Sequence, residues 1–316
     1  MRAWNAIGTF IGHNMIWIAP TCVLMACLFP EEIGLMRPAV APLFALVSFQ
    51  GALKNTFQES KRAFTRPLPL ILVLIISTAL IPALAFVLGS AIFPGKTEII
   101  CGILLEFSVP IAALSAMWCT LSGGNQALTL ALLLTSSLIC PFTLPVSMRL
   151  LLGKTIQVDV ASMMLNLLLT VALPVVAATC INDRGHGVGE KKLSSPLAPA
   201  ARLASVAIIS ANASNVAPYM RHLTPELAGV MVFIGVFTAT GYLWGLGAGK
   251  LLRLPRESIV SMSYGTGMRN ISAGAILAAA YFPAESMFPV IIGTLFQQVL
   301  AAIFGKIFER ILPKSS

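Results

Sequence analysis

Apolar residues occur along this chain in runs of about twenty, and short stretches that hold most of the charged residues separate one run from the next. An α-helix of that length crosses a hydrocarbon layer of ~30 Å. The pattern therefore predicts ten membrane-spanning helices. They cover residues 14–29, 40–53, 68–93, 99–121, 126–152, 158–181, 203–219, 226–252, 259–282 and 285–311.

Composition supports this pattern, because 57% of the 316 residues are hydrophobic and only 10% are charged. Soluble domains carry roughly 25% charged residues. The chain is therefore predicted to be an all-α polytopic membrane protein whose partner is the lipid bilayer. Its net charge of +9 is spread over short loops, which does not indicate nucleic acid, and no feature indicates a protein partner. The six cysteines lie in apolar runs without a C-x-x-C, so no metal site is predicted.

The loop charges orient the chain. Of the 21 lysines and arginines, fifteen fall on the face that holds both termini, and five fall on the other face. Positively charged loops stay in the cytoplasm, so both termini are predicted to be cytoplasmic, in a bacterial inner membrane. The remaining cation, Arg269, belongs to no loop and lies inside the ninth predicted span.

Two of the predicted spans contain residues that break helices. The fourth carries Glu106 and Pro110 near its middle, and the ninth carries Gly265 and Gly267 next to Arg269. A proline removes one helical hydrogen bond and clashes with the carbonyl four residues earlier. Irregular backbone at membrane depth is tolerated only inside protein or around a wet cavity. Both places are therefore predicted to be breaks near a functional site.

The two breaks are separated by about half the chain. Pro110 and the centre of the glycine pair are 156 positions apart, and half of the chain is 158 residues. Five spans per half require the halves to cross the membrane in opposite directions. Broken spans at matching places in two inverted halves are typical of the substrate site of secondary transporters.

Polar residues near the breaks are candidates for that site. Hydroxyl residues in membrane helices more often serve packing, whereas the amide of Asn270 needs partners at this depth. The candidates for substrate binding or coupling are Arg269, Asn270, Glu106, Thr266, Met268, Ser108 and Gln297.

Arg269 and Glu106 are the two charges near the middle of the membrane, and three interpretations remain open. They form an ion pair that merely holds the breaks together. Alternatively, Arg269 offers a bidentate fork to a substrate carboxylate or sulfate, with Glu106 as its resting partner or a proton carrier. In the third interpretation, Glu106 reaches into an outer cavity and never touches Arg269.

The chain resembles the bile acid:sodium symporter family over essentially its whole length. The resemblance is carried by PIAALSAMWCTLSGGNQALTLALL at 110–133, YGTGMRNISAGAILAAAYF at 264–282, PVIIGTLFQ at 289–297 and SFQGALKNTF at 48–57. It implies ten helices in two inverted five-helix repeats, with the fourth and ninth helices broken and crossing. It also implies a panel domain of residues 1–66 and 153–222, a core domain of 67–152 and 223–316, and alternating access between them.

The family's two sodium sites are poorly matched. By the resemblance, the glutamate that contacts both ions aligns with Gly265, and the glutamine of a G-M-Q-N run aligns with Arg269. The family has a side-chain oxygen at five further positions. By the resemblance, Ser77 aligns with a glutamine, Ser115 with a serine, Ala116 with an asparagine, Thr129 with a hydroxyl residue and Leu133 with another hydroxyl residue. Thr266 and Met268 match positions that offer backbone oxygens.

These losses predict that the Arg269 guanidinium stands in for the second ion. Sodium remains possible from the resemblance, but Gly265 and Arg269 disfavour it. The tenth span has Gln297 and Gln298 where the family has His-Asn, so a smaller organic anion is expected rather than a bile acid.

The leading hypothesis is therefore a secondary transporter of a small organic anion, driven by protons or by the anion's own gradient. One alternative is a sodium symporter of bile-acid-like or other anions. Another is a membrane sensor or passive channel built on the same fold. An enzyme is not expected, because no paired aspartates or Ser-His arrangement lies at one depth.

Overall fold

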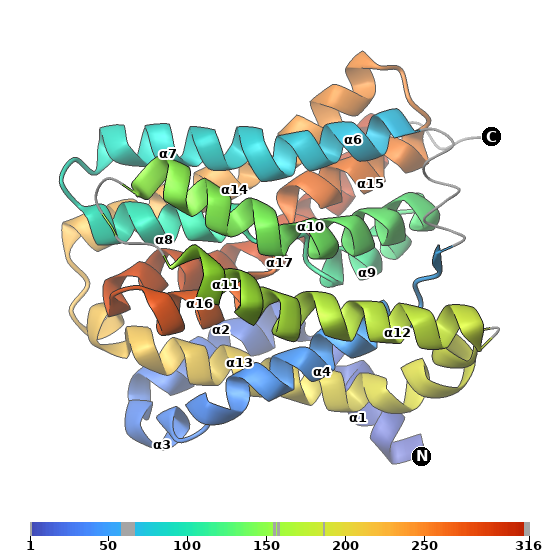
Figure 1. Ribbon diagram of the computed structural model, residues 1–316, viewed down its shortest axis with the longest axis horizontal. Helices are drawn as coiled ribbons and strands as arrows, with labels where there is room; N and C mark the ends of the chain where they lie inside the picture. Colours follow the sequence, from blue (N-terminus) through green and yellow to red (C-terminus); the bar gives the residue numbers. More distant parts are fainter. Residues whose placement is uncertain (1, 58–66, 154–155, 157–158, 186, 313–316) are drawn as a thin grey trace.

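The computed structural model describes residues 2–57, 67–153, 156, 159–185 and 187–312. Over these residues the chain is helical, and the long helices run side by side along the longest axis of the molecule (Figure 1). The first half contains α1 (Arg2–His13), α2 (Met15–Leu28), α3 (Pro30–Gly34), η1 (Arg37–Ala39), α4 (Val40–Ala52), α6 (Pro67–Ile75), η2 (Ile76–Leu80), α7 (Ile81–Ile92), α8 (Thr97–Ser108), α9 (Leu114–Leu121) and α10 (Gln126–Leu152). The second half contains α11 (Val160–Leu167), η3 (Leu168–Ala172), α12 (Leu173–Arg184), η4 (Gly189–Ser194), α13 (Ser195–Arg221), α14 (Pro225–Leu251), α15 (Arg256–Gly267), α16 (Ile271–Tyr281), η5 (Ala284–Ser286) and α17 (Met287–Ile311).

Seven helical segments of the described chain are long and apolar enough to cross a membrane. They are Pro30–Ala52, Pro67–Ile92, Gln126–Leu152, Val160–Arg184, Gly189–Arg221, Pro225–Leu251 and Ala284–Ile311. These segments coincide with the second, third, fifth, sixth, seventh, eighth and tenth predicted spans. The protein is thus a helical polytopic membrane protein, while the full count of ten spans in inverted repeats stays a prediction.

The first predicted span is preceded by a helix that the pattern did not indicate. The structure places α1 before α2 and bends the pair by 88°. Trp4 on α1 donates from its indole Nε1 to the carbonyl of Pro196 at 3.0 Å, and α1 packs along α13. α1 lies at nearly a right angle to α2 and packs along α13, so it need not be fully apolar. The hydropathy pattern therefore did not predict it.

The fourth and ninth predicted spans are each divided into two helices. In the fourth, α8 ends at Ser108 and Val109 is extended, with ψ 159°, because a proline disfavours the helical conformation of the residue before it. The break at Pro110 is therefore confirmed. In the ninth, the break lies at residues 268–270, after both glycines.

The prediction that the glycine pair itself forms the second break is wrong. Gly265 and Gly267 both lie inside α15. A Cβ at Gly267 would overlap the ring of Tyr242 on α14. Gly267 thus allows two helices to approach closely, and the extended residue is Met268, with φ −105° and ψ 124°.

The two breaks cross and bind each other. Ile111 and Arg269 form an antiparallel bridge. The N–H of Ala112 donates to the carbonyl of Met268 at 3.2 Å, and the N–H of Asn270 donates to the carbonyl of Pro110 at 2.8 Å. Each break therefore supplies hydrogen-bond partners that the other has lost, as irregular backbone at membrane depth requires.

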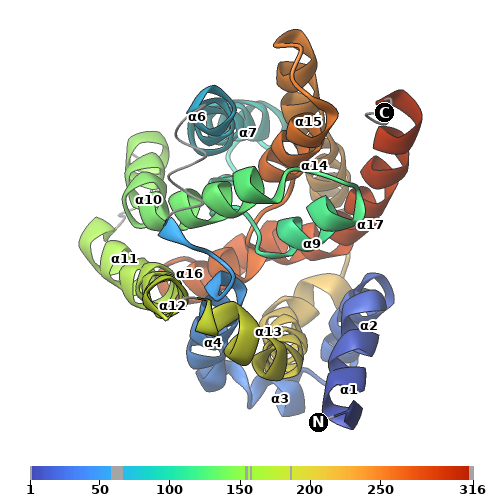
Figure 2. The same ribbon diagram turned by 90° about the vertical axis from the view of Figure 1, so that its right-hand side faces the viewer.

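The helices pack in two groups, which Figure 2 shows one above the other. In one group α13 packs against α1, α2 and α4, and α12 packs against α4. The other group contains the crossing and the helices α6–α10 and α14–α17, in which α14 packs against α15 and α17. The crossed breaks lie where the two groups meet, since α16 contacts α4 and α17 contacts α2.

The charges used to orient the chain are only partly described. The cations of residues 61–66, Lys154 and Lys314 lie outside the described residues. The orientation of the termini therefore stays a prediction.

Candidate functional site at the helix crossing

A cavity of about 100 Å³ lies beside the crossing, between the two helix groups. Three predicted site residues line it together: Arg269, Asn270 and Gln297. The opposite wall comes from α2, α4 and α13 and is mainly apolar, with Phe44 and Val47 on α4. A mostly apolar cavity with a few convergent polar groups is typical of a small-molecule site.

The sequence analysis missed several polar residues of this cavity. Ser48 on α4, Ser205 on α13 and Thr294 on α17 also line it. A single hydroxyl in a membrane helix usually serves packing, so nothing in the local sequence distinguishes these three. Only the geometry shows that they share a cavity with Arg269.

Arg269 is held by its backbone and by one end of its side chain. Its N–H donates to Gln297 Oε1 at 2.8 Å, and its guanidinium Nη2 donates to the carbonyl of Thr266 at 3.3 Å. The residue is 2% exposed, so the guanidinium does not project into lipid or bulk solvent. A guanidinium has five N–H donors, and one is engaged in the part of the chain that the structure describes, which leaves others for a ligand in the cavity.

Arg269 and Glu106 do not form an ion pair in this structure. The one ion pair among the described residues joins Lys96 and Glu226 at 2.8 Å. Glu106 is 1% exposed and its Oε2 has no hydrogen-bond partner. The interpretation in which Glu106 reaches into an outer cavity therefore does not describe this conformation. The hydroxyl of Ser108, two residues nearer the break, is likewise buried without a partner.

The positions that match sodium ligands lie in an apolar environment. A Cβ at Gly265 would lie 3.0 Å from Val73 Cγ1 and 3.1 Å from Leu132 Cδ1. Leu133 belongs to the same buried cluster, and Ala116 packs against it. Sodium in transporters is held by carbonyls and polar side chains at broken helices. The aliphatic groups around Gly265 supply no such oxygen.

The backbone oxygens that the resemblance assigned to the ions are already used. The carbonyl of Thr266 accepts from the Arg269 guanidinium, and the carbonyl of Met268 accepts from Ala112. One of these oxygens thus already has a positively charged donor.

The hydroxyl residues at the positions that match sodium ligands either form hydrogen bonds with nearby groups or form none. Ser77 Oγ donates to the carbonyl of Leu74 at 3.2 Å. Thr129 Oγ1 donates to Cys119 Sγ at 3.0 Å and to the carbonyl of Asn125 at 3.1 Å. Ser115 Oγ is buried without a partner. The crossing does not gather these hydroxyls into a common hydrogen-bonded site with Arg269.

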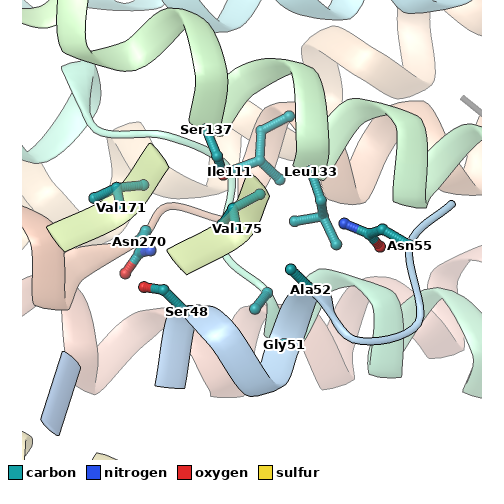
Figure 3. Close-up of a pocket in the computed structure, with 11 residues that line it drawn as sticks. Ser48, Gly51, Ala52, Asn55, Ile111, Leu133, Ser137, Val171, Val175 and Asn270 are labelled. Carbon is teal, nitrogen blue, oxygen red and sulfur yellow. The ribbon is translucent and has the colours of Figure 1, made fainter. Parts of the chain in front are cut away.

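A second, smaller cavity of about 30 Å³ lies next to the first. Figure 3 shows Ser48 on α4 and Asn270 of the crossing together on one side of it, with Asn55 at the other end. Ser48 and Asn270 line both cavities. The hydroxyl of Ser48 and Oδ1 of Asn55 are buried without a partner, and a space of this size holds water. Asn270 therefore lines both cavities and lies between them.

A third cavity, of about 350 Å³, lies away from the crossing and is lined by Lys96, Glu98, His222, Glu226 and Glu285 among others. The hydrogen bond from Lys96 to Glu226 raises the pKa of the lysine. None of the predicted site residues lines this cavity.

The chain is similar in sequence to proteins of one family. The model of the sodium bile acid symporter family matches residues 41–223. The chain is 35% identical to the uncharacterized protein YbaS of Bacillus subtilis, over 93% of this chain and 96% of that protein. It is 23% identical to the uncharacterized sodium-dependent transporter YocS of Bacillus subtilis, over 98% of this chain and 94% of that one. It is also 24% identical to the probable sodium/metabolite cotransporter BASS1 of Arabidopsis thaliana, over 96% of this chain and 76% of that protein.

The family match covers more than half of the chain, and the YbaS match covers nearly all of both proteins. This is a family of transporters rather than enzymes. The chain belongs to the sodium bile acid symporter family.

Proposed function

We propose that the protein is a secondary active transporter of a small organic anion that does not depend on sodium. The observation that carries the proposal is the buried Arg269, which lines the cavity at the crossing and whose guanidinium has no ion pair among the described residues. An arginine fork binds planar carboxylates with two parallel hydrogen bonds. A buried cation without a counter-charge is unfavourable by several kcal/mol, and an anion in the cavity supplies that charge.

The cavity dimensions favour a small substrate. About 100 Å³ of space suits a compact carboxylate and is small for a steroid. Asn270, Gln297 and the hydroxyls of Ser48 and Thr294 offer further polar contacts around the anion.

The proposal that transport does not depend on sodium rests on two observations. These are the aliphatic surroundings of Gly265 and the hydrogen bond from the Arg269 guanidinium to the carbonyl of Thr266. Two of the relatives described above have the word sodium in their names. The alternative is therefore a sodium symporter of larger anions, and the test must distinguish it from the proposed transporter.

The transport cycle would use the two helix groups. The group around α13 corresponds to the proposed panel, residues 1–66 and 153–222, and the group with the crossing to the proposed core, residues 67–152 and 223–316. Contacts within each group and the cavity between them support this division. Movement of one group against the other would expose the cavity alternately to the two sides of a bacterial inner membrane, with both termini in the cytoplasm.

The test is counterflow into proteoliposomes that contain the purified protein and one unlabelled anion at high concentration. Labelled pyruvate, benzoate, succinate and taurocholate are each assayed in sodium, potassium and choline chloride. We expect transient accumulation of at least one of the three small anions, equal within twofold in the three salts, and none of taurocholate.

A requirement for sodium would overturn the proposal in favour of the sodium symporter. A passive channel equilibrates the anion without the transient overshoot, and a sensor moves none, so either of these results would also reject the transporter.

A further inference from the structure

Glu106 is a buried acid whose environment differs from that of an ordinary structural carboxylate. It lies in the last turn of α8, two residues before that helix ends at Ser108. Its carboxyl packs against Gly293 of α17, where any Cβ would overlap Oε1. Its Oε2 has no donor. A carboxylate oxygen without a donor is unfavourable at this burial, which favours the binding of a proton by the carboxyl.

Arg269 is the charged group through which Glu106 acts. Among the described residues, it is the one charge with which the carboxyl interacts electrostatically. α8 itself and the elements that pack against it (η2, α7, α10, α16, η5 and α17) carry other titratable groups towards their ends or on other turns. These groups are Glu98, Cys101, Cys140, Arg149, Tyr281, Glu285, Lys306, Glu309 and Arg310.

One helix links the acid to the arginine. Gly293 of α17 touches Glu106, and Gln297, one turn further along α17, accepts from the N–H of Arg269. Glu106 and the backbone of Arg269 thus contact α17 one turn apart.

We propose that Glu106 is the proton-coupling residue, and that its carboxylate and the substrate anion compete for Arg269, which makes transport a one-to-one symport of a monovalent anion with a proton. The proposal rests on the proposed function above. In the empty carrier, ionised Glu106 neutralises Arg269. In the loaded carrier, the anion neutralises Arg269 and Glu106 binds one proton.

The site has no net charge in either of these states. It would bury a net negative charge if the anion were bound while Glu106 was ionised. It would bury a net positive charge if Arg269 faced neither the anion nor an ionised Glu106. The neutral states are therefore the ones that pass between the two sides. The proton enters from the side that delivers the anion and leaves with it, so no net charge crosses the membrane.

The experiment uses proteoliposomes and labelled pyruvate, or whichever monovalent anion of the panel gives the largest counterflow. A pH gradient, acid outside, is imposed with the membrane potential clamped at zero by potassium and valinomycin. A potential is then imposed without a pH gradient. Protein-free liposomes correct for diffusion of the undissociated acid.

We expect the pH gradient to accelerate uptake by the wild-type protein at least tenfold and the potential to change it less than twofold. In Glu106→Gln, uptake should lose its response to the pH gradient and respond to the potential, while counterflow remains measurable. Glu98→Gln, at the other end of α8, is the matched control and should keep the wild-type responses.

A response of Glu106→Gln to the pH gradient equal to that of the wild type would overturn the inference, as would potential-driven uptake by the wild type. If Glu106→Gln does not fold, Glu106→Asp retains an acid and should keep the proton coupling; its loss would count against the inference.

A second measurement needs no transport. With the anion bound, infrared difference spectra between the wild type and Glu106→Gln should contain the carbonyl band of a protonated carboxyl at pH 5. Absence of that band between pH 4 and pH 9 would show that Glu106 binds no proton. Absence of counterflow for every anion would instead reject the proposed function itself.

Discussion

At the scale of single residues, the site depends on a cation that the fold buries without pairing it. Arg269 donates from its backbone N–H to Gln297 and from one guanidinium nitrogen to the Thr266 carbonyl. These bonds hold the side chain and leave its other guanidinium donors without a protein partner among the described residues. A lysine at this position would present a point charge in place of a planar fork. The residue type therefore indicates a ligand with a planar or tetrahedral oxyanion.

Replacement of Arg269 tests this directly. Hydrogen bonds to charged groups contribute about 1.5–3 kcal/mol, so Arg269→Gln should raise the KM for anion counterflow by about 10- to 150-fold. Arg269→Lys should lie between Gln and the wild type. Arg149→Gln, at an exposed position in the last turn of α10, is the control and should leave the KM unchanged. An unaltered KM in Arg269→Gln would mean that the arginine only supports the crossing.

At the scale of elements, α17 holds the crossing in place from one side. Gln297 accepts from Arg269, and Gln298 accepts from the indole Nε1 of Trp118 on α9 at 2.9 Å. The phenol of Tyr242 on α14 also donates to the carbonyl of Gln297 at 3.2 Å. One turn of α17 is thereby connected to both breaks and to α14, so a displacement of α17 is transmitted to the cavity.

Loss of the Gln297 amide should weaken the crossing. Gln297→Leu leaves the buried N–H of Arg269 without an acceptor, which costs about 1–3 kcal/mol, and the apparent Tm of the purified protein should fall. Gln298→Leu is the matched control on the next residue. Its partner Trp118 is only partly buried, so the fall should be smaller. Equal Tm values for the two variants would contradict the role given to Gln297.

The sequence predicted the elements where local chemistry decides them. Pro110 favours the first break because it lacks an N–H and disfavours a helical residue before it. Pro141 and Pro145 lie inside α10 without ending it, so the surroundings contribute as well. The glycines at 265 and 267 do not break α15, because their role is contact with neighbouring helices that the sequence does not show. Long apolar spans were predicted well, whereas α1 was missed because its position follows from packing on α13.

The site was predicted in part for the same reason. Arg269 and Asn270 stand out as polar residues in an apolar run, and both line the cavity. Ser48, Ser205 and Thr294 reach it from three separate helices, and no spacing in the sequence relates them. The roles of Glu106, Ser108 and the sodium-site positions remain predictions.

At the scale of the whole molecule, the cavity at the crossing lies between the two helix groups, so in the proposed cycle their contact surface would set which side is open. Gly51 on α4 belongs to one group and Ala113 of the first break to the other. A Cβ at Gly51 would lie 3.2 Å from the Cβ of Ala113. Disulfides join residues whose Cβ atoms are about 3.5–4.5 Å apart, so a small adjustment would allow a crosslink here.

Gly51→Cys combined with Ala113→Cys should therefore form a disulfide under oxidation and fix the groups in this conformation. We expect oxidised protein to lose more than tenfold in counterflow rate and to recover it on reduction. Each single variant controls for pairing with the native cysteines. Full activity of the crosslinked protein would show that the groups need not separate at this point.

The bridge between the breaks also constrains how the chain can be inserted during synthesis. The carbonyl of Pro110 and the N–H of Ala112 find their partners on Asn270 and Met268, and the intervening segment contains most of five helical spans. Until that segment has been synthesised, the carbonyl of Pro110 and the N–H of Ala112 lack these hydrogen-bond partners inside or beside the bilayer. The first half of this protein cannot reach its final structure alone, and its maturation ends only when the ninth span arrives.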